Sequence, residues 1–255
     1  MAATVAVGAA AALSLVPFAF LVIVSLQPSP DDGSSLWVQL FTRVPIGQYM
    51  LNSAIVSLGS ALIVLVVSCA AGFGFAKLPY PGSRLALGLV VAAISVPVAT
   101  TILPNYLNLS NFGGVGTYWG PTLMYAAGAT PFSTILMTNF FRSLPDELVE
   151  AGVADGAGYF RIFASVMVPL SAPALATTGV LAFLGAWNDL LIALLFLPDP
   201  ETRTISVAVA SLESVRSSNL DLVLTGSLLS AIPPVIAFVV FQRYLVSGIT
   251  AGINK

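Results

Sequence analysis

Residues 51–76 read LNSAIVSLGSALIVLVVSCAAGFGFA and contain no charged side chain. A helix needs about 20 predominantly apolar residues to cross a hydrocarbon core about 30 Å thick, so this run is long enough for one membrane span. Similar runs, bounded by Pro, Gly and charged residues, occur at about 5–26, 85–106, 121–141, 172–197 and 222–245. We therefore predict an all-α, polytopic membrane protein with six transmembrane helices.

The overall composition supports a membrane protein. Of the 255 residues, 57% are hydrophobic and only 8% are charged, and the mean hydropathy is +0.96. An ordinary soluble domain has roughly 25% charged residues, which help to cover a surface that faces water. The default organisation is therefore one compact helical bundle, a single transmembrane domain over residues 1–255.

The first apolar run also has to be weighed as a signal peptide. It lacks a basic leader, exceeds the usual length of an apolar signal segment, and is followed by QPSPDDGSS without a small-residue cleavage pattern. We expect a retained helix.

The residue types that most enzymes and metal sites use are missing. The chain has no His and one Cys, Cys69, inside an apolar run, which excludes zinc sites, disulfides, Cys/His nucleophile pairs and haem ligation by His. The sequence also lacks a glycine-rich phosphate loop ending in Lys-Ser/Thr, so this chain cannot cradle ATP. We predict no catalytic residue, no metal and no cofactor, find no support for a nucleic-acid partner, and expect Cys69 to pack as a small hydrophobic residue.

Basic residues fall unevenly on the loops, and cytoplasmic loops carry an excess of Lys and Arg. With the N-terminus inside, the inner segments hold six basic residues and the outer loops hold three. The inner ones are Lys77, Arg84, Arg142, Arg161, Arg243 and Lys255, and the outer ones are Arg43, Arg203 and Arg216. We predict an N-in, C-in orientation.

The predicted inner loop 142–171 reads as a short helix, a glycine break and a second apolar approach to the membrane. Ser143 is expected to cap the helix, with Asp146 and Glu147 in its first turn, where acidic groups are favourable. Gly156 and Gly158 are expected to supply the break. A helix this short is not stable alone, so its apolar face needs a surface on which to dock.

The order of residues in this loop resembles the EAA loop of bacterial ABC importer permeases. That pattern is Glu-Ala-Ala, a Gly after three further residues, and apolar-x-apolar-Pro about ten residues later. The matching positions are Glu150, Ala151, Gly152, Asp155, Gly156, Ala157, Val166, Val168 and Pro169. One departure is Gly152 in place of the second Ala, which is expected to loosen the helix slightly.

The resemblance extends over most of the chain and points to the carbohydrate-uptake branch, the maltose or glycerol-phosphate type of second permease. NSAIVS from Asn52 looks like the start of the family's first core helix. GFGFAKLPYPGSR, the triplet Trp187-Asn188-Asp189 and the ending QRYLVSGITAGINK resemble three further family segments. Their order and spacing along one chain make the combination specific.

The resemblance implies a type I importer fold in a bacterial inner membrane, and a permease subunit that imports a sugar or sugar derivative. The implied partners are a second permease in a heterodimer, two ATP-binding subunits, an extracytoplasmic solute-binding protein and membrane lipid. In this reading 142–171 is the cytoplasmic coupling loop, and Glu150, Ala151, Gly152, Asp155 and Gly156 contact the ATPase. Glu150 is expected to accept hydrogen bonds from polar groups of its groove.

Polar residues inside the predicted spans are candidates for the translocation path, because such groups usually face protein or a water-filled cavity. The candidates are Asn52, Asn105, Trp187, Asn188 and Asp189. The indole of Trp187 would stack on a sugar face and the amides would bond its hydroxyls. Alternatively, Asn188 and Asp189 cap or brace a break in the fifth helix, and this structural reading is favoured.

Other features leave alternatives open. The polar loop 198–221 is expected to meet a binding protein. Pro97, Pro104 and the pair at 233–234 are expected to kink their helices.

Six spans would also suit an ion-coupled secondary transporter, although such carriers usually have internal repeats and several intramembrane carboxylates. The identity of the solute stays open.

Overall fold

The structure is a computed structural model of the 255-residue chain, and it describes residues 2–29, 33–78, 80–213 and 220–250. Two residues used to predict the orientation, Arg216 and Lys255, lie outside the described residues, as does the last part of the C-terminal motif. The described segments are helices joined by turns, with one isolated β-bridge between Pro28 and Ser35. The all-α prediction is confirmed for this part of the chain.

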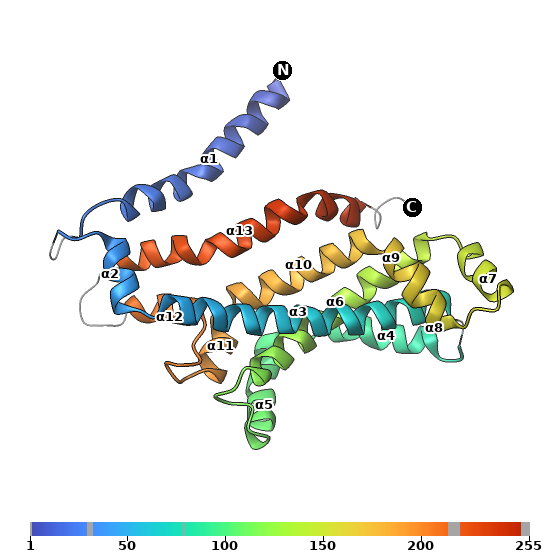
Figure 1. Cartoon of the computed structure of the whole chain (residues 1–255). Coiled ribbons are helices and arrows are strands. Elements are labelled where there is room, and N and C mark those ends of the chain that lie inside the picture. Colours follow the sequence, from blue (N-terminus) through green and yellow to red (C-terminus); the bar gives the residue numbers. More distant parts are fainter. Residues whose placement is uncertain (1, 30–32, 79, 214–219, 251–255) are drawn as a thin grey trace.

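The helices follow one another along the chain as in Figure 1. Their bounds are α1 Ala2–Ser25, α2 Leu36–Arg43, α3 Ile46–Lys77, α4 Ser83–Ile94, α5 Val98–Asn111, α6 Trp119–Ser143, α7 Glu147–Ala154, α8 Tyr159–Ile162, the π-helix η1 Phe163–Met167, α9 Val168–Leu170, α10 Ala172–Asn188, α11 Leu191–Phe196, α12 Ile205–Glu213 and α13 Leu220–Thr250.

The long helix α3 is the centre of the bundle. It packs against α6 and α10, while α13 packs on α10 and α1 on α13 (Figure 1). Many large apolar side chains of these helices are exposed, among them Leu58 and Leu62 of α3 and Phe238 of α13. In a bilayer such side chains face lipid, so their exposure is expected.

Small residues bring α3 and α6 together at two levels. At one level, Ser60 Oγ donates to the Thr122 carbonyl over 3.2 Å. At the other, a Cβ added to Gly72 would lie 2.7 Å from Met137 Cβ and 3.0 Å from two backbone atoms of α6. Membrane helices associate mainly by close packing and interhelical hydrogen bonds, so small residues at the contact are the expected solution.

Two helices are long and apolar enough to cross a membrane by themselves, α3 and the segment Leu220–Tyr244 of α13, among the described residues. Two bent pairs of helices bring the number to four if each pair is one span. These pairs are α4 with α5, bent by 99°, and Tyr159–Leu170 with α10, bent by 78°. The chain is thus a polytopic helical membrane protein, and six spans stay a prediction.

Proline explains one of the bends. The predicted kink at Pro97 is a complete break, because α4 ends at Ile94 and Pro97 adopts an extended conformation directly before α5. Pro104 lies inside α5, and Pro233 and Pro234 lie inside α13, and both helices continue through these residues. The predicted fifth span is also interrupted, between α10 and α11, at a position without proline.

We predict that Gly72→Ala lowers the melting temperature of the protein in lipid nanodiscs, whereas Gly74→Ala does not. The new Cβ at position 72 meets the backbone of α6, which cannot move aside as a flexible side chain would, and such overpacking costs about 1–3 kcal/mol. Gly74 is the matched control, because a Cβ there meets nothing within 4 Å. Equal melting temperatures for the two variants would contradict the close approach of α3 and α6.

Candidate functional site

The predicted short helix is present as α7, but its start differs from the prediction. Ser143 is the last residue of α6, where its Oγ donates to the Phe140 carbonyl over 2.7 Å, so its predicted role as a cap of α7 is wrong. Leu144 is extended because the residue before a proline, here Pro145, is driven out of the helical region. The residue before α7 is therefore Asp146, and its side chain makes no capping hydrogen bond.

The predicted glycine break after α7 is confirmed. The helix ends at Ala154, and Gly156 has a φ of 76°, in the left-handed region that glycine adopts without a steric penalty. The predicted second apolar segment, which leads back to the membrane, is the helical run Tyr159–Leu170. The chain bends between this run and α10. Its middle, Phe163–Met167, is a π-helix that the sequence did not reveal.

Gly152 has a packing role that the sequence comparison with the Glu-Ala-Ala pattern missed. A Cβ at this position would lie 2.8 Å from Ile162 Cγ1 and 2.9 Å from Ile162 Cδ1. Ile162 is 1% exposed, so its side chain has little room to move away. The missing side chain at 152 therefore lets α7 lie directly against α8.

One face of α7 is packed and the other is open. Val149 is buried in an apolar cluster that includes Phe73 and Phe141, whereas Val153 is 47% exposed. Four of the five residues predicted to contact an ATPase are exposed, and the fifth, Gly152, is half-buried. The exposed ones are Glu150, Ala151, Asp155 and Gly156. The structure thus brings these residues together on one short segment with an accessible surface.

A cavity of about 730 Å³ lies between the end of α3 and α7. Glu150, Arg142 and Asp146 supply charged groups to its wall, and Val149 and Val153 supply apolar ones. We call it the α3–α7 cavity. It combines an apolar wall with charges of both signs, which suits contact with a protein surface.

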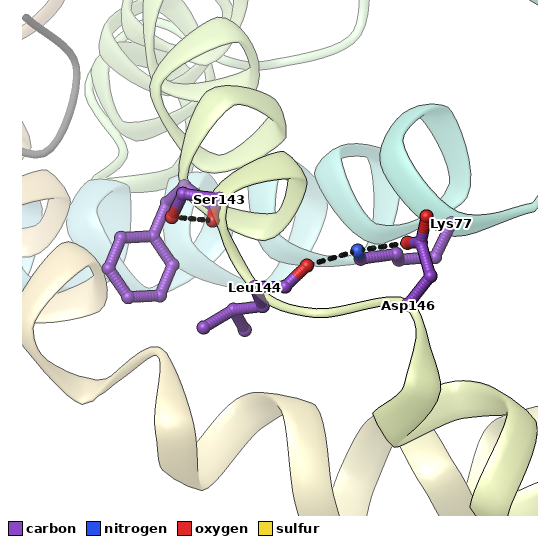
Figure 2. A network of polar contacts seen from close by, with 5 residues as sticks. Lys77, Ser143, Leu144 and Asp146 are labelled. Carbon is purple, nitrogen blue, oxygen red and sulfur yellow. Dashed lines mark hydrogen bonds and ion pairs between the residues drawn. The ribbon is translucent and has the colours of Figure 1, made fainter. Parts of the chain in front are cut away.

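Lys77, the last residue of α3, joins three helix ends at this cavity. Its Nζ donates to the Leu144 carbonyl at the end of α6 over 2.6 Å and to the Asp146 carboxylate before α7 over 2.5 Å (Figure 2). The side chain of Lys77 is 3% exposed and that of Asp146 is 78% exposed. A cation at helix C-termini and an anion at a helix N-terminus are each favourable with the helix dipoles.

The sequence offered little sign of this contact. In the sequence Lys77 is one basic residue of the predicted inner loops and part of GFGFAKLPYPGSR, and neither feature indicates its partner. Pairing it with Asp146 requires α3 and α6 to end at the same level, which is a tertiary property.

Asn52 is buried, 2% exposed, and both ends of its amide are used. Its Nδ2 donates to the carbonyls of Glu201 and Arg203, each over 2.9 Å, and its Oδ1 accepts from the Tyr118 hydroxyl over 2.8 Å. This geometry holds a loop onto α3. It leaves Asn52 no free group to offer to a solute.

Trp187 is also part of the packing. The residue is 3% exposed, its ring lies 5.4 Å from that of Phe183, and Nε1 donates to the Ser230 carbonyl over 3.1 Å. The indole expected to stack on a sugar is therefore buried in an apolar cluster, with the Phe183 ring beside it. Trp187 joins α10 to α13.

Asp189 lies in the break between α10 and α11. Its Oδ1 accepts from the Ile192 backbone N–H and from the Tyr125 hydroxyl, both over 2.8 Å. The first bond satisfies a backbone donor at the start of α11, and the second ties the break to α6. These contacts agree with the favoured reading that Asp189 braces a helix break.

Of the five candidates for the translocation path, Asn188 and Asn105 have accessible amide groups. Asn188 is exposed and lines a cavity of about 380 Å³ together with the serines at 206, 227 and 230. Asn105 is half-buried and lines a cavity of about 250 Å³ at the bend between α4 and α5. Both cavities border the helix breaks of the structure.

Comparisons with known proteins agree with this architecture. The osmoprotective compounds uptake permease protein GgtD of Synechocystis sp. is 33% identical, covering 92% of this chain and 85% of that protein. The trehalose/maltose transport system permease protein MalG of Thermococcus litoralis is 31% identical, covering 96% and 93%. These similarities run over nearly the whole bundle, including α7.

The fold also matches a solved structure. It is the crystal structure of a bacterial ABC transporter involved in the import of the acidic polysaccharide alginate, with a TM-score of 0.81 at 22% identity over 95% of each chain. The model of the family described as binding-protein-dependent transport system inner membrane component matches residues 68–251. The chain therefore belongs to this family, as the non-catalytic, multi-pass inner-membrane permease subunit of a binding-protein-dependent ABC importer.

Proposed function

We propose that this chain is one half of the pore of an importer for a sugar or an uncharged sugar derivative. Its six helices cross the inner membrane with both termini inside, residues 1–255 forming one transmembrane domain. It pairs with a second, different permease, binds two ATP-binding subunits inside, and receives solute from an extracytoplasmic binding protein. Because the chain belongs to the family of binding-protein-dependent permeases, the alternative of an ion-coupled secondary transporter is set aside.

The names of the relatives support a sugar as the solute. One relative is a trehalose/maltose permease, and another is a melibiose/raffinose/stachyose import permease from Bacillus subtilis that is 29% identical over 94% of this chain. Residues lining the 380 Å³ cavity are amide, hydroxyl and apolar in character, with no charged side chain among them. Such groups suit the hydroxyls and apolar faces of a neutral sugar better than a charged solute.

The observation that carries the coupling role is the exposed face of α7. A short helix whose one face is packed on the bundle while Glu150 and Ala151 stay exposed offers a ready docking surface. The loop 142–171 is then the cytoplasmic coupling loop, and Glu150, Ala151, Gly152, Asp155 and Gly156 are its contact segment. A docked, packed helix can transmit a rigid-body shift of the ATPase to the pore.

We assign the translocation path to Asn188 and Asn105 rather than to all five candidates. Their amides are accessible and line cavities, whereas Asn52 and Trp187 use their polar groups within the protein. Asp189 supports the path by bracing the break next to Asn188. The outer loop that begins at residue 198 is placed to meet the binding protein.

The direct test is reconstitution. The chain is co-expressed with partner permease, ATPase and binding protein, and ATP hydrolysis is measured in nanodiscs with maltose, trehalose, melibiose and raffinose and, as a charged solute, with glycerol phosphate. We expect a stable complex whose hydrolysis rises with binding protein and one of these sugars. A complex that never responds to binding protein would refute the importer role, and a response to charged solutes alone would refute the sugar assignment.

We predict that Glu150→Ala lowers the stimulation of ATP hydrolysis by loaded binding protein about two- to fivefold, because one exposed charged contact contributes up to about 1 kcal/mol. Glu147→Ala is the matched control. It removes the same charge from the first turn of α7, but Glu147 does not line the α3–α7 cavity. An equal loss in both variants would argue for a general charge effect rather than a contact at Glu150.

We predict that Asn188→Ala raises the sugar concentration for half-maximal transport about two- to tenfold, since a neutral hydrogen bond contributes about 0.5–1.5 kcal/mol. Uptake of radiolabelled sugar into proteoliposomes measures it. Asn139→Ala serves as the comparison, because Asn139 is an exposed amide of α6 that does not line this cavity. If both variants behave like the wild type, Asn188 does not contact the solute.

A further inference from the structure

Helix α3 is bonded at one end to the residues 144–146 that precede α7; these residues and α7 together are called the coupling segment. Lys77 is the last residue of α3. It donates hydrogen bonds to the Leu144 carbonyl at the end of α6 and to the Asp146 carboxylate at the start of α7. Asp146 also accepts, through its backbone carbonyl, from the N–H groups of Val149 and Glu150. Any displacement of α7 therefore acts on a group that is bonded to the end of α3.

The other end of α3 is clamped to the loop before α12. Asn52 donates to the Glu201 and Arg203 carbonyls, and Gln48 Nε2 donates to the Glu201 carbonyl over 2.7 Å. Ser53 Oγ accepts from the Ile205 backbone N–H over 2.8 Å, and Ser53 is 2% exposed. This loop is thus held by α3 through four hydrogen bonds, of which the one between Ile205 and Ser53 is buried.

Between the two clamps α3 runs without interruption. It contains no proline, whereas α5, α6 and α13 each contain at least one, and two other candidate spans are bent pairs. At a rise of about 1.5 Å per residue, Asn52 and Lys77 lie about 37 Å apart along the helix axis. A continuous helix of this length packed on α6 and α10 moves as one element.

We propose that α3 moves as one rigid element, called the rod below, and transmits movement of the coupling segment to the loop 198–205. Lys77 is the positioning residue at the inner clamp of this helix. Ser53 and Asn52 form its outer clamp. The inference rests on the proposed docking of α7 on an ATPase subunit. It goes beyond that docking by naming the route and the residues through which nucleotide binding inside reaches the outer loop.

The unequal burial of the ion pair makes the inner clamp testable. Lys77→Met removes the buried cation and leaves behind Asp146, a carboxylate that water already solvates. Substituting Asp146 instead would strand a buried charge, which is costly to the fold. Lys77→Met therefore disconnects α3 from α7 with the smaller disturbance, and Lys77→Arg retains the charge and the donors.

The experiment is hydrogen exchange on the complex with its partner permease and ATPase subunits in nanodiscs, without nucleotide and with ATP plus vanadate. Two peptides are followed. Protection of α7 reports docking on the ATPase, and the nucleotide-dependent change in the peptide 198–208, which contains the Ile205 N–H bonded to Ser53, reports the rod.

In the wild type we expect both signals. Lys77→Met shrinks the nucleotide-dependent change at 198–208 by at least about fivefold, the low end of typical allosteric coupling, and Lys77→Arg restores at least half of it. Arg84→Gln is the control, since it removes an exposed cation that follows soon after α3 in the sequence and leaves the change as in the wild type. Ser53→Ala diminishes the change while α7 stays protected, because it removes one of the bonds between α3 and the loop.

The outcomes separate the two proposals. An unprotected α7 in the wild-type complex refutes the docking of α7 and the rod with it. A protected α7 with an undiminished change at 198–208 in both Lys77→Met and Ser53→Ala refutes the rod and leaves the docking intact. A loss in Lys77→Met that Lys77→Arg does not restore refutes the ion pair as the inner clamp.

Discussion

The close contact between α3 and α6 is the constraint on which the rest of the structure depends. Gly72 presses against the backbone at Met137, and Ser60 bonds the backbone at Thr122, so the two helices are fixed in register at two levels. Because they are fixed there, α3 and α6 end together, and the ammonium of Lys77 reaches the Leu144 carbonyl. The position of α7 relative to the bundle follows from that register.

Two polar residues within the predicted spans, Asn52 and Asp189, support a loop and a helix break. The sequence made both residues candidates for the translocation path, with the bracing role favoured for Asp189, because polar residues inside a span usually face protein or water. In the structure their bonds go to backbone groups that a loop or a helix break leaves unpaired. In an apolar surrounding each such group is costly to leave unsatisfied, so side-chain amides and carboxylates are used as braces.

The segment around α7 shows which features follow from local sequence rules and which follow from tertiary packing. Pro145 and Gly156 bound α7 through their own backbone preferences, and both could be recognised in the sequence. The start of α7 was misjudged because Ser143 had the right chemistry for a cap but stood before a proline-imposed extended residue. The role of Gly152 could not be foreseen, since it depends on Ile162 lying against it.

The sequence by itself determined the membrane location, the helical class, the short helix that ends before Gly156 and the family, because these rest on local apolar runs, Pro and Gly positions and motif spacing. Only the tertiary structure decided that Lys77 pairs with Asp146, that Trp187 and Asn52 are buried, and that Asn188 faces a cavity. The physical reason is that these properties depend on the register and crossing of helices distant in sequence. Hydropathy and spacing along one chain do not specify that register.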